Sequence, residues 1–259
     1  MLNAIEAVDW GRLPGPADLY RPDHAATGLR ALAAATGLVQ AADAGALLAG
    51  GGLLHDHSGA VFPAAVTAAP FLLAIAWHGH PQAGATALGL LDDALAFATR
   101  ATRATRATRD GRRTRVATPY AEAAPICCAL ADHLRGGADL LAASGREGKW
   151  LLAEAAEHWR FDVQEAVAVA EGEGEGEGEG EGDGAVAFGV LAGRFPGDDG
   201  TQAAELHRLG RIAFLEQVVL HYPPEDGTPD ACLRIGGVRP DELVSPAVLF
   251  RARCDGPMH

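Results

Sequence analysis

Short apolar segments with helical spacing, separated by glycine and proline, constrain the fold of this chain more than any other feature. Leu29, Leu32, Ala33 and Thr36 fall at positions i, i+3, i+4 and i+7, which places them on one face of a helix. Pro22 suits the first turn of that helix, because a first-turn residue needs no backbone N–H donor. The sequence therefore predicts a helix that begins near Pro22.

The same pattern recurs along much of the chain. One further helix opens at Phe62-Pro63 and contains Pro70, which is expected to kink or split it. Another begins at Pro81. The remaining predicted helices cover residues 41–54, 118–135, 147–159, 185–191 and 201–220, with a helical turn within 241–250. The predicted apolar face of the helix over 147–159 consists of Leu152, Ala155, Ala156 and Trp159.

These segments predict an all-α fold. The hydrophobic fraction is 48% and is dominated by alanine, the strongest helix former, while aromatic residues make up only 6%. Paired helices that repeat at roughly 40 residues are typical of stacked antiparallel helical hairpins, as in a HEAT-like α-solenoid. A compact α-bundle is the alternative. We expect a single helical-repeat domain over residues 1–259, with low-complexity inserts at 99–115 and 171–184.

The second insert consists of alternating glutamate and glycine. It has no apolar side chains to bury, its like charges repel, and glycine loses the most backbone entropy on folding. The expected role of this insert is that of a mobile acidic linker, and the alternative is that it lies against the arginine-rich insert.

One region resembles a known family. The residues that carry the resemblance are Trp10-Gly11-Arg12-Leu13, Tyr20-Arg21-Pro22, Pro70-Phe71-Leu72 and, above all, the stretch from His55 to Ala65. With these motifs, residues 10–97 resemble uncharacterised bacterial HEAT-repeat-like proteins. The resemblance implies a helical-repeat scaffold for contacts between proteins, and it implies no catalytic residues. It also implies that the aromatic residue and the proline of this stretch set how one helical pair enters the next.

Charge and cysteine content bear on partners and compartment. The formal net charge of −13 repels nucleic acid at long range, so nucleic acid is not the expected partner. Cys127, Cys128, Cys232 and Cys254 show no CxxC spacing, and the amino terminus has no basic region followed by an apolar run. The apolar stretches are too short to span a bilayer. We expect a cytoplasmic protein with free thiols and no membrane contact.

Four histidines form the densest titratable group. His55, His57, His78 and His80 form two His-x-His pairs, which the predicted helix beginning at Pro63 would hold at opposite ends. A shared metal ion requires ligands about 2 Å away, whereas a helix of ~20 residues spans about 30 Å. We therefore expect a structural junction made of His55, His57, Phe62 and Pro63, and no metal or cofactor. The alternative is a metal-dependent enzyme that uses the four histidines.

Positive charge is concentrated in the first insert. Its arginines recur at intervals of three residues or fewer: Arg100, Arg103, Arg106, Arg109, Arg112, Arg113 and Arg115. On a helix this spacing would form a basic ridge that could bind phosphate, nucleic acid or an acidic partner. The alternative is a solvated loop produced by repeat expansion.

No catalytic motif emerges from the chain. The sequence contains no Walker loop, dinucleotide fingerprint, Gly-x-Ser-x-Gly elbow or His-Glu-x-x-His motif. Cys127 and Cys128 are expected to be buried apolar residues within a helix. The function predicted from the sequence is that of a non-enzymatic scaffold that binds another macromolecule, expected to be a protein.

Overall fold

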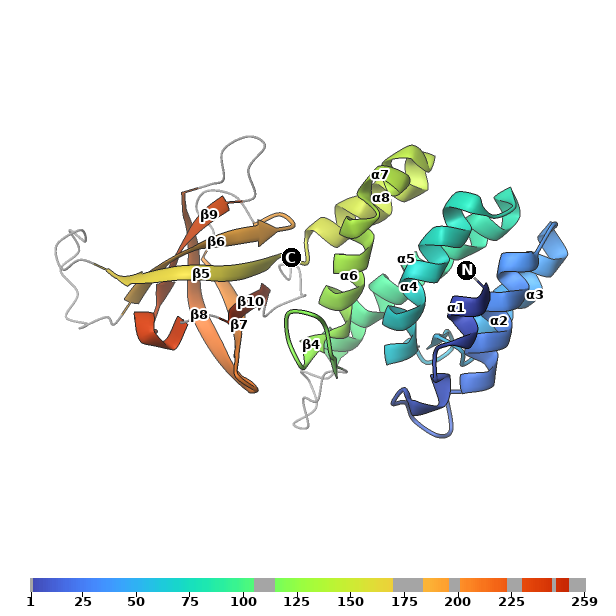
Figure 1. Cartoon of the computed structure of the whole chain (residues 1–259), viewed down its shortest axis with the longest axis horizontal. Coiled ribbons are helices and arrows are strands. Elements are labelled where there is room, and N and C mark those ends of the chain that lie inside the picture. The colour runs from blue at the N-terminus through green and yellow to red at the C-terminus, as the bar shows by residue number, and fades with distance from the viewer. Residues whose placement is uncertain are drawn as a thin grey trace. The chain divides into compact units, whose positions relative to one another are not determined.

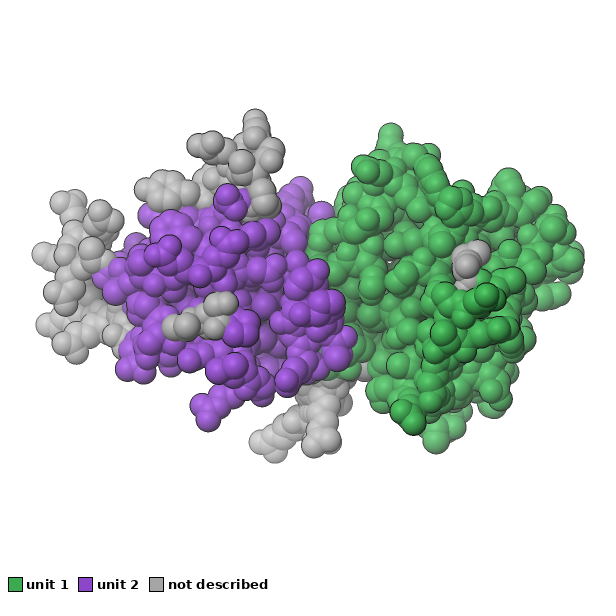
Figure 2. Space-filling model, viewed as in Figure 1, with its two compact units in different colours: residues 1–116, 124–155, 257–259 green, residues 117–123, 156–256 purple. Residues whose placement is uncertain are grey.

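The chain forms two compact units, which are described separately. The computed structural model describes residues 2–104, 115–169, 184–195, 201–222, 230–243 and 246–251. The helical unit comprises residues 1–116 and 124–155 together with 257–259, and the barrel unit comprises residues 117–123 and 156–256. Figure 1 labels their elements, and Figure 2 colours the helical unit green and the barrel unit purple.

Helices make up most of the helical unit. The short helix α1 (Leu2–Glu6) and the 3-10 turn η1 (Trp10–Arg12) precede two helical hairpins. The first hairpin joins α2 (Pro22–Ala34) to α3 (Leu38–Ala49), and the second joins α4 (Pro63–His78) to α5 (Pro81–Ala104). They are followed by α6 (Ile126–Gly136), α7 (Ala138–Ala143) and α8 (Gly145–Ala156).

Proline and glycine set the limits and the spacing of these helices. Pro22 and Pro63 occupy the first turns of α2 and α4, where a proline costs no hydrogen bond. Helix α4 continues through Pro70 as one element. Gly28 lets α2 approach α3 closely, because a Cβ at this position would lie only 2.7 Å from the side chain of Leu48.

A small β-hairpin connects the two helical hairpins. Strand β1 (Leu54–His55) pairs antiparallel with β2 (Ala60–Val61), and Phe62 follows directly. Phe62 is 1% exposed, and its ring lies 5.2 Å from that of Tyr20 between centroids. The hydroxyl of Tyr20 donates to the backbone oxygen of Trp10 at 2.8 Å. These aromatic contacts link the amino-terminal segment to the start of α4.

The barrel unit is a closed antiparallel barrel with the strand order β10-β5-β6-β9-β8-β7. Its strands are β5 (Arg160–Ala168), β6 (Gly184–Ala192), β7 (Gln202–Arg208), β8 (Arg211–Tyr222), β9 (Asp230–Gly236) and β10 (Ala247–Arg251). The 3-10 turn η2 (Pro240–Leu243) lies between β9 and β10. Elsewhere, β3 (Arg115–Val116) and β4 (Ala124–Pro125) form a two-stranded pair.

Small side chains fill much of the barrel interior. Ala185, Ala187, Ala204 and Ala231 belong to its buried core, whereas Phe188 on β6 is 42% exposed. The small residues lie inside and the large one outside because barrel diameter falls with strand number, and six strands leave a narrow interior. Larger core residues, among them Trp159, Phe161 and Leu249, complete the packing.

The barrel contradicts the all-α prediction. The segments 185–191 and 201–220, predicted as helices, are strands, and residues 241–250 include β10 as well as a helical turn. Their alanines were interpreted as helix formers, although they are the small interior residues of a narrow barrel. The chain is therefore neither a HEAT-like α-solenoid nor an α-bundle. The assignment of residues 1–259 to one domain stays a prediction.

Both low-complexity inserts extend beyond the described part of the chain. Residues 105–114 of the first insert and residues 170–183, which include most of the second, lie outside it. The second insert follows β5 and precedes β6, which pair with each other antiparallel. Within the described residues, no helix is both long and apolar enough to cross a membrane.

Candidate functional site

A groove lined by residues of α5 and α8 lies within the helical unit. Its volume is about 660 Å³, within the ~300–1,000 Å³ typical of ligand sites. Helix α5 contributes residues at i, i+3, i+4 and i+7, and α8 contributes residues from its first two turns. The lining residues are Ala85, Leu88, Gly89 and Asp92 on α5, and Arg146, Glu147, Trp150 and Leu151 on α8.

The groove combines an apolar floor with an exposed aromatic wall. Leu88 and Leu151 are buried, whereas Trp150 is 62% exposed. Gly89 lies on the exposed side of α5, and a Cβ placed there would meet no atom within 4 Å. The groove therefore stays open at Gly89, which has no side chain. The indole of Trp150 exposes apolar surface to solvent beside it.

Charged side chains lie beside this apolar surface. Asp92 and Glu147 each contribute a carboxylate, and Arg146 contributes one guanidinium group. The lining thus carries one net negative charge. None of these lining residues is a serine, cysteine or histidine.

A second cavity lies within the barrel unit. It measures about 210 Å³ and is bounded by the turn between β7 and β8 and by the segment 117–123. His207 reaches it from β7 and is 7% exposed. The Nε2 atom of His207 lies 3.3 Å from Oε2 of Glu205, which is also buried.

The arginine-rich insert is only partly described. The backbone of Arg100 and Arg103 belongs to the last turns of α5, and Arg115 begins β3. Arg106, Arg109, Arg112 and Arg113 lie outside the described residues. The basic ridge and its alternative, the solvated loop, both stay predictions for this segment.

The four histidines lie near opposite ends of α4, with His55 and His57 before its start and His78 and His80 at its end. His55 belongs to β1, and its Nδ1 lies 2.9 Å from the hydroxyl of Ser58 within the hairpin turn. The ring of His57 lies 5.9 Å from that of His55. His78 ends α4, and His80 directly precedes α5. Within the described residues, no cluster of three or more potential metal ligands includes these histidines.

Phe62 and Pro63 occupy the positions expected of a junction. Phe62 directly precedes α4, and its backbone N–H donates to the oxygen of Leu53 at 3.0 Å. Pro63 is the first residue of α4 and is buried. The burial of Phe62 agrees with a packing role, and the structural role assigned to the whole group stays a prediction.

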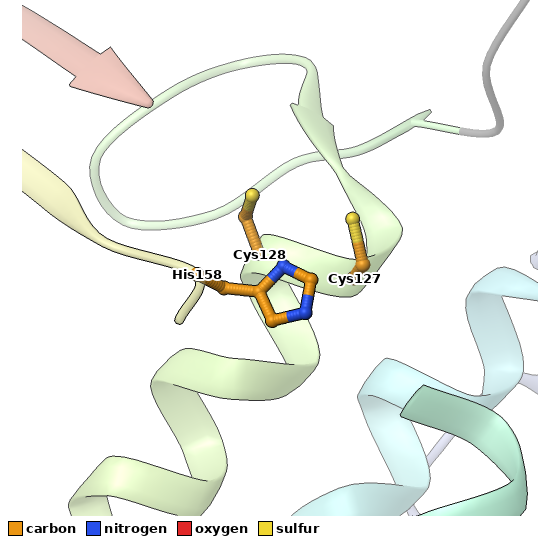
Figure 3. A group of neighbouring side chains, drawn as sticks. All are labelled: Cys127, Cys128 and His158. Atoms are coloured by element: carbon orange, nitrogen blue, oxygen red, sulfur yellow. The ribbon is translucent and has the colours of Figure 1, made fainter. Parts of the chain in front are cut away.

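Two neighbouring cysteines lie in the first turn of α6. Cys127 and Cys128 are buried, and neither belongs to a disulfide (Figure 3). His158, the third side chain drawn in Figure 3, comes from the barrel unit. Because the three residues belong to different units, no metal site is assigned to them. In the barrel unit, burial raises the pKa of the Cys232 thiol, which disfavours its nucleophilic form.

Sequence reasoning did not identify Gly89, Trp150 or His207. Trp150 was available as a signal, because it is one of only four tryptophans and lies off the apolar face predicted for residues 147–159. Gly89 gave no signal, because an isolated glycine within a helical pattern has no distinctive spacing. His207 lies in a segment that was predicted to be helical, so its position on the same strand face as Glu205 was not predicted.

Comparison with known proteins does not assign a function to either cavity. The chain matches no family model, no curated protein and no solved structure.

Proposed function

We propose that this protein is a non-catalytic binding protein whose helical unit holds a segment of a partner protein in the groove between α5 and α8. The observation that carries the proposal is the exposed indole of Trp150 beside the open space at Gly89. Tryptophan is enriched among the residues that dominate binding energy at protein interfaces. Exposed apolar surface beside a groove is a common mark of such a site.

The shape of the groove favours a short amphipathic helix as the occupant. The lining residues Ala85 to Asp92 span two turns of α5, which is about 10 Å along the helix axis. A partner helix of similar length would place apolar side chains at i, i+3 or i+4, and i+7 into such a groove. The small residues Ala85 and Gly89 leave room for those side chains.

The charges select the class of partner segment. Asp92 and Glu147 outnumber Arg146 in the lining, and the whole chain carries a formal charge of −13. A lysine or arginine beside the apolar anchors would therefore be attracted, and a glutamate there would be repelled. We also propose that this binding takes place in the cytoplasm, because Cys127 and Cys128 form no disulfide, which fits a reducing compartment.

A panel of labelled amphipathic peptides tests the proposal. Each peptide carries leucine, phenylalanine or tryptophan anchors at helical spacing with flanking lysines, and binding is measured by fluorescence anisotropy. Matched peptides replace the lysines by glutamates or the anchors by alanines. We expect binding of lysine-flanked peptides with intact anchors, and weaker binding of both matched sets.

Two glycine variants give the matched control. Gly89→Leu fills the groove and favours helix, so the unit should stay folded while peptide binding is lost. Gly136→Leu makes the same change at the end of α6, where a Cβ also meets no atom within 4 Å, and should leave binding intact. Failure of every peptide to bind, or equal binding by both variants, would refute the proposed function.

A further inference from the structure

The second cavity, in the barrel unit, has a built polar site that the proposed function does not use. Its walls come from two places, the β7–β8 turn and the segment 117–123. Apolar surface is supplied by Leu209, Ile212 and Pro246. The volume of about 210 Å³ corresponds to a few water molecules, since each occupies ~30 Å³ in the liquid. Such a space suits a small molecule or the end of one side chain.

His207 presents a defined hydrogen-bonding atom in this cavity. The carboxylate of Glu205 lies 3.3 Å from Nε2 of His207, and the tautomer with its proton on Nε2 leaves Nδ1 as an acceptor. The edge of Phe250 further fixes the ring, at 4.9 Å between centroids and an interplanar angle of 76°. Among the described residues, no hydrogen bond to Nδ1 of His207 is found.

Glu122 provides a second acceptor across the cavity. A Cβ built on Gly210 would lie 3.5 Å from Oε2 of Glu122, which places this carboxylate over the β7–β8 turn. The segment that carries Glu122 is held in place, because the hydroxyl of Thr118 accepts from the backbone N–H of Ala121 at 3.0 Å. The ring of Tyr120 also stacks on the guanidinium of Arg160, at 3.5 Å.

The two arginines at this turn point away from His207. Arg208 pairs directly with Arg211 across the hairpin, and His207 pairs with Ile212. Because neighbouring residues on a strand project to opposite faces, the arginine side chains leave on the face opposite to His207. Both arginines remain lining residues of the cavity, which His207, Glu122 and the apolar Leu209, Ile212 and Pro246 also line.

We propose that this cavity binds a primary ammonium group on a short alkyl chain. The ammonium donates hydrogen bonds to Nδ1 of His207 and to the carboxylate of Glu122, since an ammonium offers three donors and no acceptor. The alkyl carbons pack against Ile212, Leu209 and Pro246. This inference rests on the barrel unit alone and is independent of the groove in the helical unit.

Nuclear magnetic resonance of the full chain with labelled histidine tests this site. The probe is n-propylammonium, and the readout is a saturable shift of the His207 Cε1–Hε1 signal, assigned by its loss in His207→Gln. We expect Glu122→Gln to weaken n-propylammonium binding about tenfold, because a charge-assisted hydrogen bond becomes a neutral one. Glu122 is exposed, so this variant should fold normally.

Three matched probes decide the chemistry. Tetramethylammonium has the charge without N–H donors, n-propanol has a donor without the charge, and acetate tests for an anion site at the arginines. Each should shift the His207 signal weakly and without saturation. An equal saturable shift with any of them, no saturable shift with n-propylammonium, or unchanged n-propylammonium binding in Glu122→Gln would overturn the assignment.

Discussion

Replacing Phe62 by alanine should destabilise the helical unit strongly. The ring is 1% exposed and packs 5.2 Å from the ring of Tyr20, so the substitution removes nearly a whole buried aromatic side chain. Truncations of this kind cost about 3–5 kcal/mol. Phe62→Leu keeps much of the apolar volume and loses mainly the ring pair, which contributes about 0.5–1.5 kcal/mol. We therefore expect a graded loss in the free energy of unfolding.

Hydrogen exchange measured by mass spectrometry can locate this loss. Peptides from α2 and α4 report the local free energy of opening in the helical unit. Trp77→Ala is the matched control, because Trp77 lies on the same helix and is 54% exposed, so its removal should change stability by less than about 0.5 kcal/mol. If Phe62→Ala lowered protection no more than Trp77→Ala does, Phe62 would not be a core residue.

Three further substitutions test other parts of the fold. Burial raises the pKa of Tyr20 to about 12, so the folded unit retains this proton more tightly than the unfolded chain. The stability in urea should therefore be full below pH ~10 and fall from pH ~10 to ~12, and Tyr20→Phe should reduce that fall. Gly189→Ala should destabilise the barrel by more than about 1 kcal/mol in thermal unfolding, because its Cβ would overlap the backbone oxygen of Asp162. An unchanged melting temperature would contradict this packing. Leu209 and Gly210 have φ angles of 44° and 74°, the signature of a type I′ turn, so Leu209→Asn should stabilise the barrel by about 1 kcal/mol in the same assay, and a loss would contradict the turn.

Local sequence signals were sufficient for several helices of the helical unit. Pro22 and Pro63 are read correctly as first-turn residues of α2 and α4. The apolar stripe that includes Leu29 and Leu32 is the buried face of α2. These features depend on backbone geometry and on neighbours within one or two turns, so they can be predicted from the sequence alone.

Some local signals were misleading because packing overrode them. Thr118-Pro119 was expected to begin a helix, but Thr118 instead closes a turn through its hydroxyl, and α6 begins at Ile126. Trp159 was expected on the apolar face of a helix, yet α8 ends at Ala156 and Trp159 lies in the barrel core. The turn at Thr118 is itself a local contact, whereas the contacts that bury Trp159 involve residues distant in sequence.

The candidate sites depended even more on tertiary structure. Gly89 and Trp150 lie 61 positions apart in the chain, and they line one groove only because the fold places α5 and α8 on either side of it. The cavity at His207 likewise needs Glu122 from a segment that precedes the barrel strands. No periodic pattern in the sequence indicates which distant residues line the same cavity.

The amino-acid sequence by itself determined where several helices of the first part of the chain begin and which faces they bury. Only the tertiary structure decided that the carboxy-terminal segments are strands. Val186, Phe188 and Val190 on β6 project outward, while Ala185 and Ala187 fill the interior, so no alternation of apolar and polar residues marks this strand. β7 and β8 form a local hairpin, but the barrel closes through pairs that lie far apart in the sequence, such as β5 with β10 and β6 with β9, and the energy of that pairing is absent from any local window of sequence.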